Sequence, residues 1–438
     1  MSERRRPSPD EGDSAPSTGR ARFRAGAGRP PFAHLRPVLA AAVAYAVAAL
    51  AWAVVGEPLP GGRWAAVHLF TLGTLTNLVA AMTEHFARTL TRAATDEHRT
   101  GRLLTLNAGA LLTLVGLVAG WPWAFATGAG LATVAVLWLY RALRRMRTRA
   151  TGARFGYVVR AYEHACAAFV LGAILGALLG TGLVGGPWYS AARLAHLTVT
   201  VLGWGGLVLL ATVVFFAPTL MRTQMAPGTE RLAVPALRYG TGALALAVVA
   251  LALTAAPGAY GVGARGLAAV GLAGYAAAAT AVCWPVLRAS RKAVASPHAH
   301  MIAAACAWFP LVAWAGVVVA AAGRDELLDA LGLVLLVGVL GQAIVASVAY
   351  LVPMATGGGP AARAAERHEL DRWPLVRAGG WNLAVVLLAA GVALPRLTGL
   401  ETGALVVTGW VVIAGVIGAH LGLGAAALRA GRDADAAA

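Results

Sequence analysis

Charged residues are scarce in this chain, and lysine is almost absent. Only 13% of the 438 residues are charged and Lys292 is the single lysine, whereas a soluble globular protein carries roughly a quarter of charged residues. Hydrophobic residues make up 59% of the sequence. This composition argues against an ordinary soluble domain and indicates an integral membrane protein.

Cysteine is rare as well. The three cysteines, Cys166, Cys283 and Cys306, stand in apolar stretches without Cys-x-x-Cys spacing. A disulfide framework or a zinc knuckle is therefore not expected, and we interpret the three as small packing residues. The Arg-rich start, residues 1–36, has no apolar core segment, so we expect a disordered cytoplasmic tail rather than a cleaved signal peptide.

The hydrophobic residues gather in twelve stretches that each approach the length needed to cross a bilayer, about 20 residues. We expect one all-α membrane domain over residues 37–428, followed by a short cytoplasmic tail at 429–438. The division between the third and fourth spans rests only on the turn at residues 120–123. The expected spans are 37–56, 64–87, 103–120, 122–140, 157–182, 190–217, 238–256, 266–288, 299–322, 326–353, 379–395 and 402–428.

Arginine is distributed unevenly about these spans. With the amino terminus in the cytoplasm, 31 of the 36 Lys and Arg residues fall on the inner side, as the positive-inside rule predicts. The five outer ones are Arg63, Arg193, Arg265, Arg324 and Arg396. The net charge of +17 is thus explained by insertion in the cell membrane with both termini cytoplasmic. The bilayer is the expected partner, and nucleic acid is not.

Histidine is costly inside a bilayer unless it has a partner. His68 lies near the outer end of the second span, and His196 lies about two turns below the outer surface in the sixth. Two imidazoles at one depth on separate helices suit a haem with two histidine ligands, or copper. Alternatively, each ring hydrogen-bonds a backbone carbonyl or a polar side chain of a neighbouring helix.

Further histidines lie near the predicted inner face, and two of them follow a glutamate, Glu84 or Glu163. They are candidates for an inner metal site or a proton path. Alternatively they are hydrated at the interface, where the glutamates snorkel. The inner candidates for metal are His85, His164, His300 and His420.

Spans two, six and ten are all predicted to run from outside to inside, and they share a pattern. Gly203 precedes Pro218 by the same interval as Gly338 precedes Pro353, and spans two and six both open with His-Leu. A period of four spans within twelve predicts three four-helix arcs.

Twelve spans, four-helix arcs and a histidine high on spans two and six resemble subunit I of the haem-copper oxidases. The stretches "HLFTLGTLTNLVAAMTEHF", "HLTVTVLGWGGL" and "GQAIVASVAYLVPMATGGGP" are similar to bacterial polytopic proteins called copper oxidases. Some of those precede a copper nitrite-reductase or multicopper-oxidase domain. The NnrS family of nitric-oxide-stress membrane proteins is more distantly similar. The resemblance covers most of residues 37–428.

This resemblance implies a membrane redox protein of respiratory or nitrogen-oxide metabolism. His68 and His196 would hold haem b or copper, and a copper protein or a cytochrome would be the redox partner. The oxidase pattern is nevertheless incomplete. Span ten has no histidine pair, and Thr200 stands where the oxidases have a tyrosine four residues beyond the histidine of span six. An oxygen-reducing binuclear centre is therefore not expected, and the chain is not a terminal oxidase.

Two other functions fit the sequence. Helices interrupted by glycine and proline are common in secondary transporters, so the chain could carry a metal, haem or a small solute. The absence of Asp and Glu from the middle of the spans argues against a proton-coupled version. A scaffold for a partner oxidase is the third possibility, and the sequence leaves open whether the chain is an enzyme.

Overall fold

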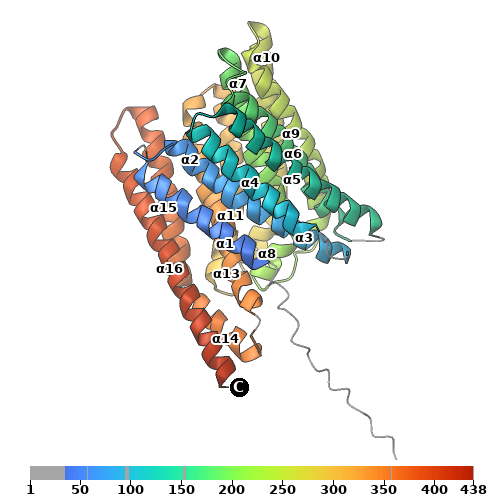
Figure 1. The fold of residues 1–438 in the computed structure, drawn as a ribbon, viewed down its shortest axis with the longest axis vertical. Helices are drawn as coiled ribbons and strands as arrows, with labels where there is room; N and C mark the ends of the chain where they lie inside the picture. Colours follow the sequence, from blue (N-terminus) through green and yellow to red (C-terminus); the bar gives the residue numbers. More distant parts are fainter. Residues whose placement is uncertain (1–34, 57, 94–97, 151–153, 357, 438) are drawn as a thin grey trace, which may run out of the picture.

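The computed structural model describes residues 35–437 except 57, 94–97, 151–153 and 357, and this part of the chain folds into helices without strands (Figure 1). Twelve of its helices are long and apolar enough to cross a membrane, which confirms the predicted number. They are α1 (Arg36–Val55); α2, η2 and α3 (Gly62–Thr91); α4 (Arg99–Val118); α5 (Pro122–Arg149); α6 (Gly156–Gly180); α7, η3 and α8 (Pro187–Leu220); α9 with η4 (Thr229–Ala255); α10 (Ala259–Ser290); α11 (Pro297–Ala322); η5, α12, η6 and α13 (Asp325–Thr356); α15 (Pro374–Thr398); and α16 (Gly403–Ala436).

The third and fourth spans are separate helices, as the turn at residues 120–123 predicts. Gly120 has a φ of 67°, a left-handed conformation that favours glycine, and Pro122 begins α5, a position where the missing N–H has no intrahelical acceptor. The two helices pack closely, since a Cβ on Gly109 would lie 2.5 Å from the backbone nitrogen of Ala132.

Two helical segments lie outside the expected spans. Helix α5 continues to Arg149, beyond the expected end of the span at residue 140. A further helix, α14 (Pro360–Leu370), forms between the expected spans 326–353 and 379–395. It buries Ala362, Glu366 and Leu370 and lies against the end of α16, where both helices extend from the bundle (Figure 1).

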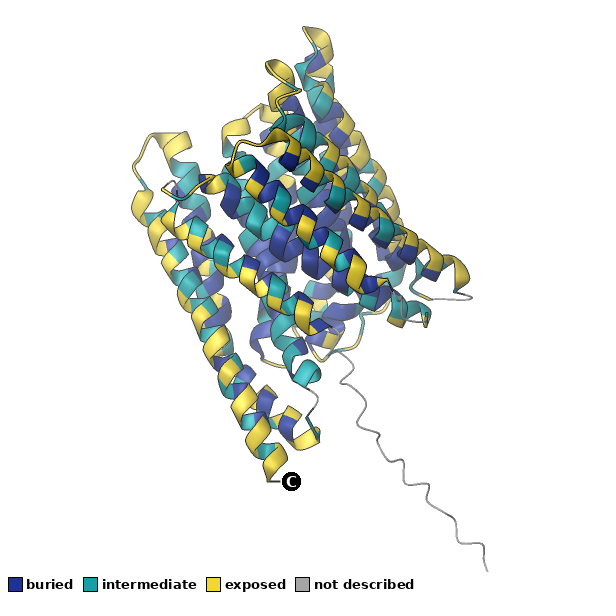
Figure 2. Cartoon of the chain, viewed as in Figure 1, coloured by how far each residue is buried: buried dark blue, intermediate teal, exposed yellow. Residues whose placement is uncertain are grey.

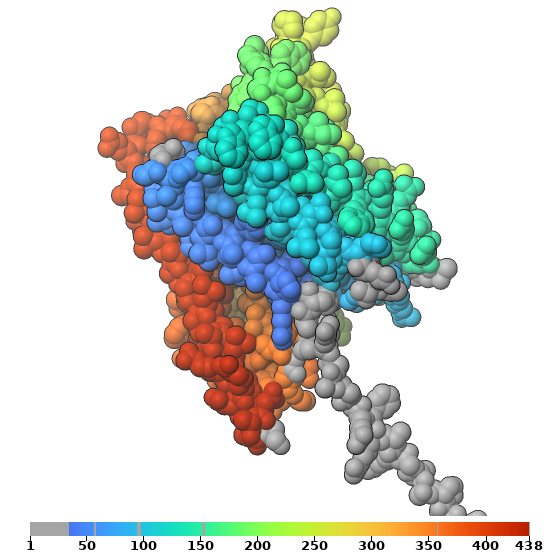
Figure 3. Space-filling model, in the orientation of Figure 1, coloured from blue at the N-terminus to red at the C-terminus, as the bar shows by residue number. Residues whose placement is uncertain are grey.

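The second and sixth spans lie deepest in the bundle. In the sixth span 72% of the most apolar stretch is buried, and in the second 56%, whereas α1 and α16 each have 22%. Buried residues accordingly concentrate on the inner helices, and exposed ones on the outer faces (Figure 2). Helices α1 and α16 lie side by side on one face of the molecule (Figure 3).

Spans two, six and ten each contain a π-helical segment at a similar level. These are η2 (Leu69–Leu75), η3 (Val199–Gly206) and η6 (Val334–Gly341). η6 starts and ends the same number of residues after η3 starts and ends. The same number of residues separates Gly203 from Gly338. The start of η2 precedes that of η3 by a slightly shorter interval. π-Helices are rare and are frequent at functional sites, so three in matching positions indicate an internal repeat.

The three π segments meet at matching residues. Leu75, Gly205 and Leu340 are related by the same two intervals that relate the starts of the π segments. A Cβ on Gly205 would lie 3.0 Å from a methyl carbon of Leu340 and 3.3 Å from one of Leu75. A glycine at this position therefore lets the three spans approach one another. The His-Leu openings of spans two and six do not match in this register, because the interval between them is shorter than that between η2 and η3.

Candidate functional site

A cavity of about 1080 Å³ lies beside the three π segments. Its walls are mainly apolar and come from all three repeats, including Phe70, Trp204 and Val337. It extends toward the ends of the spans that carry Arg63 and Arg193. Cavities of this size, apolar with a few converging polar groups, are typical ligand sites.

His68 and His196 both line this cavity. The two imidazole rings are nearly parallel, at 12°, and their centroids are 6.5 Å apart. His68 is the last residue of α2, directly before η2, and His196 lies in α7, shortly before η3. The structure thus brings together the two outer histidines that the sequence selects.

Both histidines use the same ring nitrogen for a backbone hydrogen bond. His68 Nδ1 lies 2.8 Å from the carbonyl oxygen of Trp64, and His196 Nδ1 lies 2.8 Å from that of Gly172. A carbonyl only accepts, so Nδ1 carries the proton in each ring. The Nε2 lone pair of each neutral imidazole is consequently left for a ligand, an arrangement found at metal-binding histidines.

Packing fixes the two rings. Trp64 stacks on His68 with a centroid distance of 4.0 Å. Gly176 of α6 faces His196, where an added Cβ would lie 3.0 Å from the ring carbon Cε1. A larger residue at position 176 would push this ring from its place.

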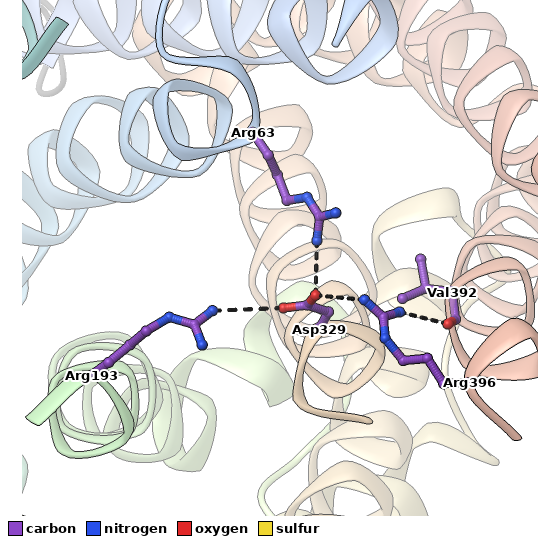
Figure 4. A network of polar contacts seen from close by, with 5 residues as sticks. All are labelled: Arg63, Arg193, Asp329, Val392 and Arg396. Carbon is purple, nitrogen blue, oxygen red and sulfur yellow. Dashed lines mark hydrogen bonds and ion pairs between the residues drawn. The ribbon is translucent and has the colours of Figure 1, made fainter. Parts of the chain in front are cut away.

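Three arginines surround one carboxylate at the end of the cavity that Arg63 and Arg193 line (Figure 4). Asp329 of α12 forms ion pairs with Arg63 of α2 at 2.9 Å, with Arg396 of α15 at 2.9 Å and with Arg193 of α7 at 3.9 Å. Of these four residues, Arg63, Arg193 and Asp329 line the cavity. The group has two more positive than negative charges, which favours an anionic group at this end of the cavity.

Polar side chains also join the spans at mid-membrane. The amides of Asn77 and Asn107 hydrogen-bond reciprocally, at 3.0 and 2.8 Å, and tie the second span to α4. Trp204 donates to the hydroxyl of Thr76 at 3.1 Å. Gln342, the polar residue of span ten, is fully buried, and its amide makes no hydrogen bond with any described residue.

The two inner glutamates are buried and paired, so the snorkelling interpretation is wrong for them. Arg102 donates to Glu84 at 2.5 Å, with Arg99 at 3.8 Å. Arg147 holds Glu163 by two hydrogen bonds of 2.6 and 3.1 Å. The Glu84 pair joins α3 to α4, and the Glu163 pair joins α5 to α6. Sequence reasoning missed both pairs because each arginine stands several helical turns away along the chain, on another helix.

The inner metal site or proton path expected at the four inner histidines stays a prediction. No group of three His, Cys, Asp or Glu side chains in the described part of the chain is arranged to hold a metal ion. His85, His164, His300 and His420 lie on the separate helices α3, α6, α11 and α16. His420 Nδ1 donates to the carbonyl of Val416 at 2.8 Å, and His85 contacts the ring of Phe86 edge-on.

Comparison with known proteins adds no relationship. No model of a protein family matches this chain, and no curated protein matches it. The chemistry of the site must therefore be inferred from its geometry.

Proposed function

We propose that this chain is a membrane-embedded redox protein that binds haem b or copper through His68 and His196 and serves respiratory or nitrogen-oxide metabolism. The observation that carries the proposal is the pair of parallel imidazoles, each with its Nδ1 bonded to a carbonyl, in the wall of a large apolar cavity. A haem held there would transfer single electrons.

The spacing of the rings fits a shared metal ion. Two metal–nitrogen bonds of about 2 Å and two ring radii of about 1.1 Å place the centroids of opposed imidazoles about 6.2 Å apart. The observed separation is 6.5 Å. By this measure, haem iron and copper fit equally well.

Three features favour haem over copper. The described residues supply only two donors at this place, and haem iron brings four nitrogen ligands of its own. The cavity is large enough to hold a macrocycle. Haem b also carries two carboxylates, which match the two excess positive charges around Asp329.

The arrangement in three four-helix arcs, as in oxidase subunit I, belongs to the same proposal. It is supported by the three π segments in matching positions and by their meeting at Gly205. Span ten has Leu331 at the position that matches His196, so the third repeat supplies no further ligand. An oxygen-reducing centre is accordingly not part of the proposal, and a copper protein or a cytochrome is the proposed redox partner.

A secondary transporter is the second candidate. The observation in its favour is the central cavity between internal repeats, with a charged cluster at its outer end, because transporters bind solutes at repeat interfaces. In that case the two histidines would bind a metal ion, haem or small solute in transit.

An absorption spectrum of the detergent-purified protein tests the proposal. We expect a Soret band that shifts on reduction and disappears in His68→Ala and in His196→Ala. His85→Ala serves as the control and should retain the band, since His85 lies on the inner half of α3. A colourless, metal-free protein that regains no band when loaded with haem would contradict the redox proposal and favour the transporter.

A further inference from the structure

A fully buried arginine lies at the inner end of α15. Arg377 is only 2% exposed. Its Nη1 donates to the carbonyl oxygens of Leu370 and Arg372, at 2.7 and 3.1 Å. Its Nε and Nη2 are buried without a hydrogen-bond partner, and Arg377 forms no ion pair with a carboxylate of the described residues.

This arrangement leaves the guanidinium only partly compensated, since Asp371 acts on its charge but forms no ion pair with it among the described residues. Burying an ionised group is costly unless it is both paired and hydrogen-bonded. Nη1 fastens the turn between α14 and α15, but carbonyl dipoles do not neutralise the guanidinium. The free Nε and Nη2 edge is the side of arginine that binds a carboxylate or phosphate with two parallel hydrogen bonds.

The surroundings of Arg377 are also incompletely bonded. Asp371 is held by Arg222 at 3.1 Å and lies 3.7 Å from Nδ1 of His298. Among the described residues, the Nε2 atoms of His298 and His420 and Oδ1 of Asp371 are buried without hydrogen-bond partners. The charge of Arg377 acts on both histidine rings. Two arginines against one aspartate leave one positive charge in this group. Orphaned buried polar atoms that gather in one place indicate a missing water or ion.

We propose that this inner cluster binds one small oxyanion, a carboxylate or phosphate group, on the Nε–Nη2 edge of Arg377 beside His298 and His420. The anion neutralises the excess charge and satisfies the free guanidinium edge. The cluster joins the end of α8 to α11, α15 and α16, so an anion there fastens the inner ends of four spans. The site is separate from the His68–His196 pair and does not depend on the proposed redox function.

The oxyanion can come from two sources. One is a free anion from the inner aqueous side, and the other is the headgroup phosphate of an anionic lipid. Both offer the same chemistry to the guanidinium. If the site takes a free anion, formate or phosphate alone should stabilise lipid-free protein in detergent. If it takes a lipid headgroup, only the lipid should do so.

Thermal unfolding of the lipid-depleted protein in detergent tests the proposal, with sodium formate or phosphate titrated against sodium chloride at constant ionic strength. We expect a saturable rise of the midpoint of about 2 °C at ten times the dissociation constant. If only phosphatidylglycerol micelles give the rise, the anion is a lipid headgroup. Arg377→Gln should abolish the saturable part, and His420→Gln should weaken it.

Arg291→Gln is the matched control, since Arg291 is an exposed arginine at the inner end of α10. It should respond as the wild type does. Should Arg377→Gln fail to fold, the wild-type titration and His420→Gln still decide the matter. No saturable rise with formate, phosphate or phosphatidylglycerol in the wild type, or an equal rise in Arg377→Gln, would overturn the proposal.

Discussion

Arg63 and Arg193 reach the same carboxylate from two different repeats. Their guanidinium nitrogens lie 2.9 and 3.9 Å from the oxygens of Asp329 (Figure 4). The interval between the two arginines in the sequence equals the interval between the starts of η2 and η3, so they occupy matching places. The third repeat supplies the acid, so the ion pairs hold together the ends of spans two, six and ten that carry these residues.

Asp329→Asn should loosen this end of the three spans. Without the carboxylate, three guanidinium groups repel one another, and the repulsion is strongest at low ionic strength. The side chains are partly exposed, so the expected decrease of the thermal midpoint is modest, about 2 °C at low salt, and added salt should reverse it. Asp325→Asn is the control, because among the described residues Asp325 pairs with one arginine, Arg265, at 3.5 Å. Equal midpoints for the two variants at low salt would show that Asp329 is not the centre of the network.

Glu84→Ala should destabilise the protein far more. It removes the carboxylate that faces Arg102 and Arg99 in a buried place, and breaking such a pair costs about 3–5 kcal/mol. Glu84→Gln keeps an acceptor for Arg102 and should lose less. Denaturant unfolding of the purified variants measures the difference. Glu230→Gln breaks the exposed pair with Arg154 and should change little; a comparable loss in that variant would contradict the distinction.

Two glycines of α10 should respond oppositely to alanine. A Cβ on Gly271 would lie 2.6 Å from the backbone nitrogen of Ala247 in α9, and backbone cannot move aside as a side chain can. Gly271→Ala should therefore separate α9 from α10 and cost about 1–3 kcal/mol. Gly266 has no atom near its Cβ position, so Gly266→Ala should be neutral or stabilising. A folded, fully stable Gly271→Ala would show that the helices are less tightly packed than described.

The sequence predicts the helical fold well and for a clear physical reason. In a bilayer each helix satisfies its own backbone, so length and hydropathy suffice to find it. The twelve spans follow in this way. The Gly203–Gly338 relationship follows from the equal spacing of glycine and proline in spans six and ten. Length and hydropathy do not predict the π segments, because the residues of these segments are as apolar as those of an α-helix. Helix α14 was missed because its buried face depends on contact with α16.

The candidate site is likewise predictable from the sequence only in part. His68 and His196 can be chosen from the sequence because a histidine at that depth is costly and both spans run in one direction. Their separation of 6.5 Å depends on how the spans pack, which no spacing reveals. The convergence of arginines on Asp329 and the free edge of Arg377 likewise arise from residues far apart in the chain.

Reporter fusions should establish the orientation expected from the arginine distribution. Fusions after residues 60, 186, 260, 324 and 398 should report the outer side, and those after 95, 150, 228, 294 and 366 the inner side. Each group samples loops on one predicted side of the twelve spans and serves as the control for the other. Two or more inverted reports would overturn the proposed orientation.

The docking of α14 on α16 should weaken as the pH rises. Glu366 of α14 is buried against Gly431 and accepts a hydrogen bond from Thr356 at 3.0 Å. Burial, the larger effect, raises the pKa of Glu366 above its ordinary value, and Asp435 adds to this, while the Thr356 bond and nearby arginines oppose it. A carboxyl whose pKa is higher in the folded state stabilises that state when protonated, so the contribution is present at low pH and is lost as the pH rises through the raised pKa.

Hydrogen exchange of the α14 amides, corrected for the intrinsic effect of pH, should therefore show increasing opening from about pH 4.5 upward. Glu366→Gln resembles the protonated acid and should remove this dependence. Glu369→Gln should keep it, because Glu369 is a half-buried neighbour that pairs with Arg372 at 3.0 Å. Opening that is independent of pH in the wild type would show that Glu366 is not a destabilising charge in this contact.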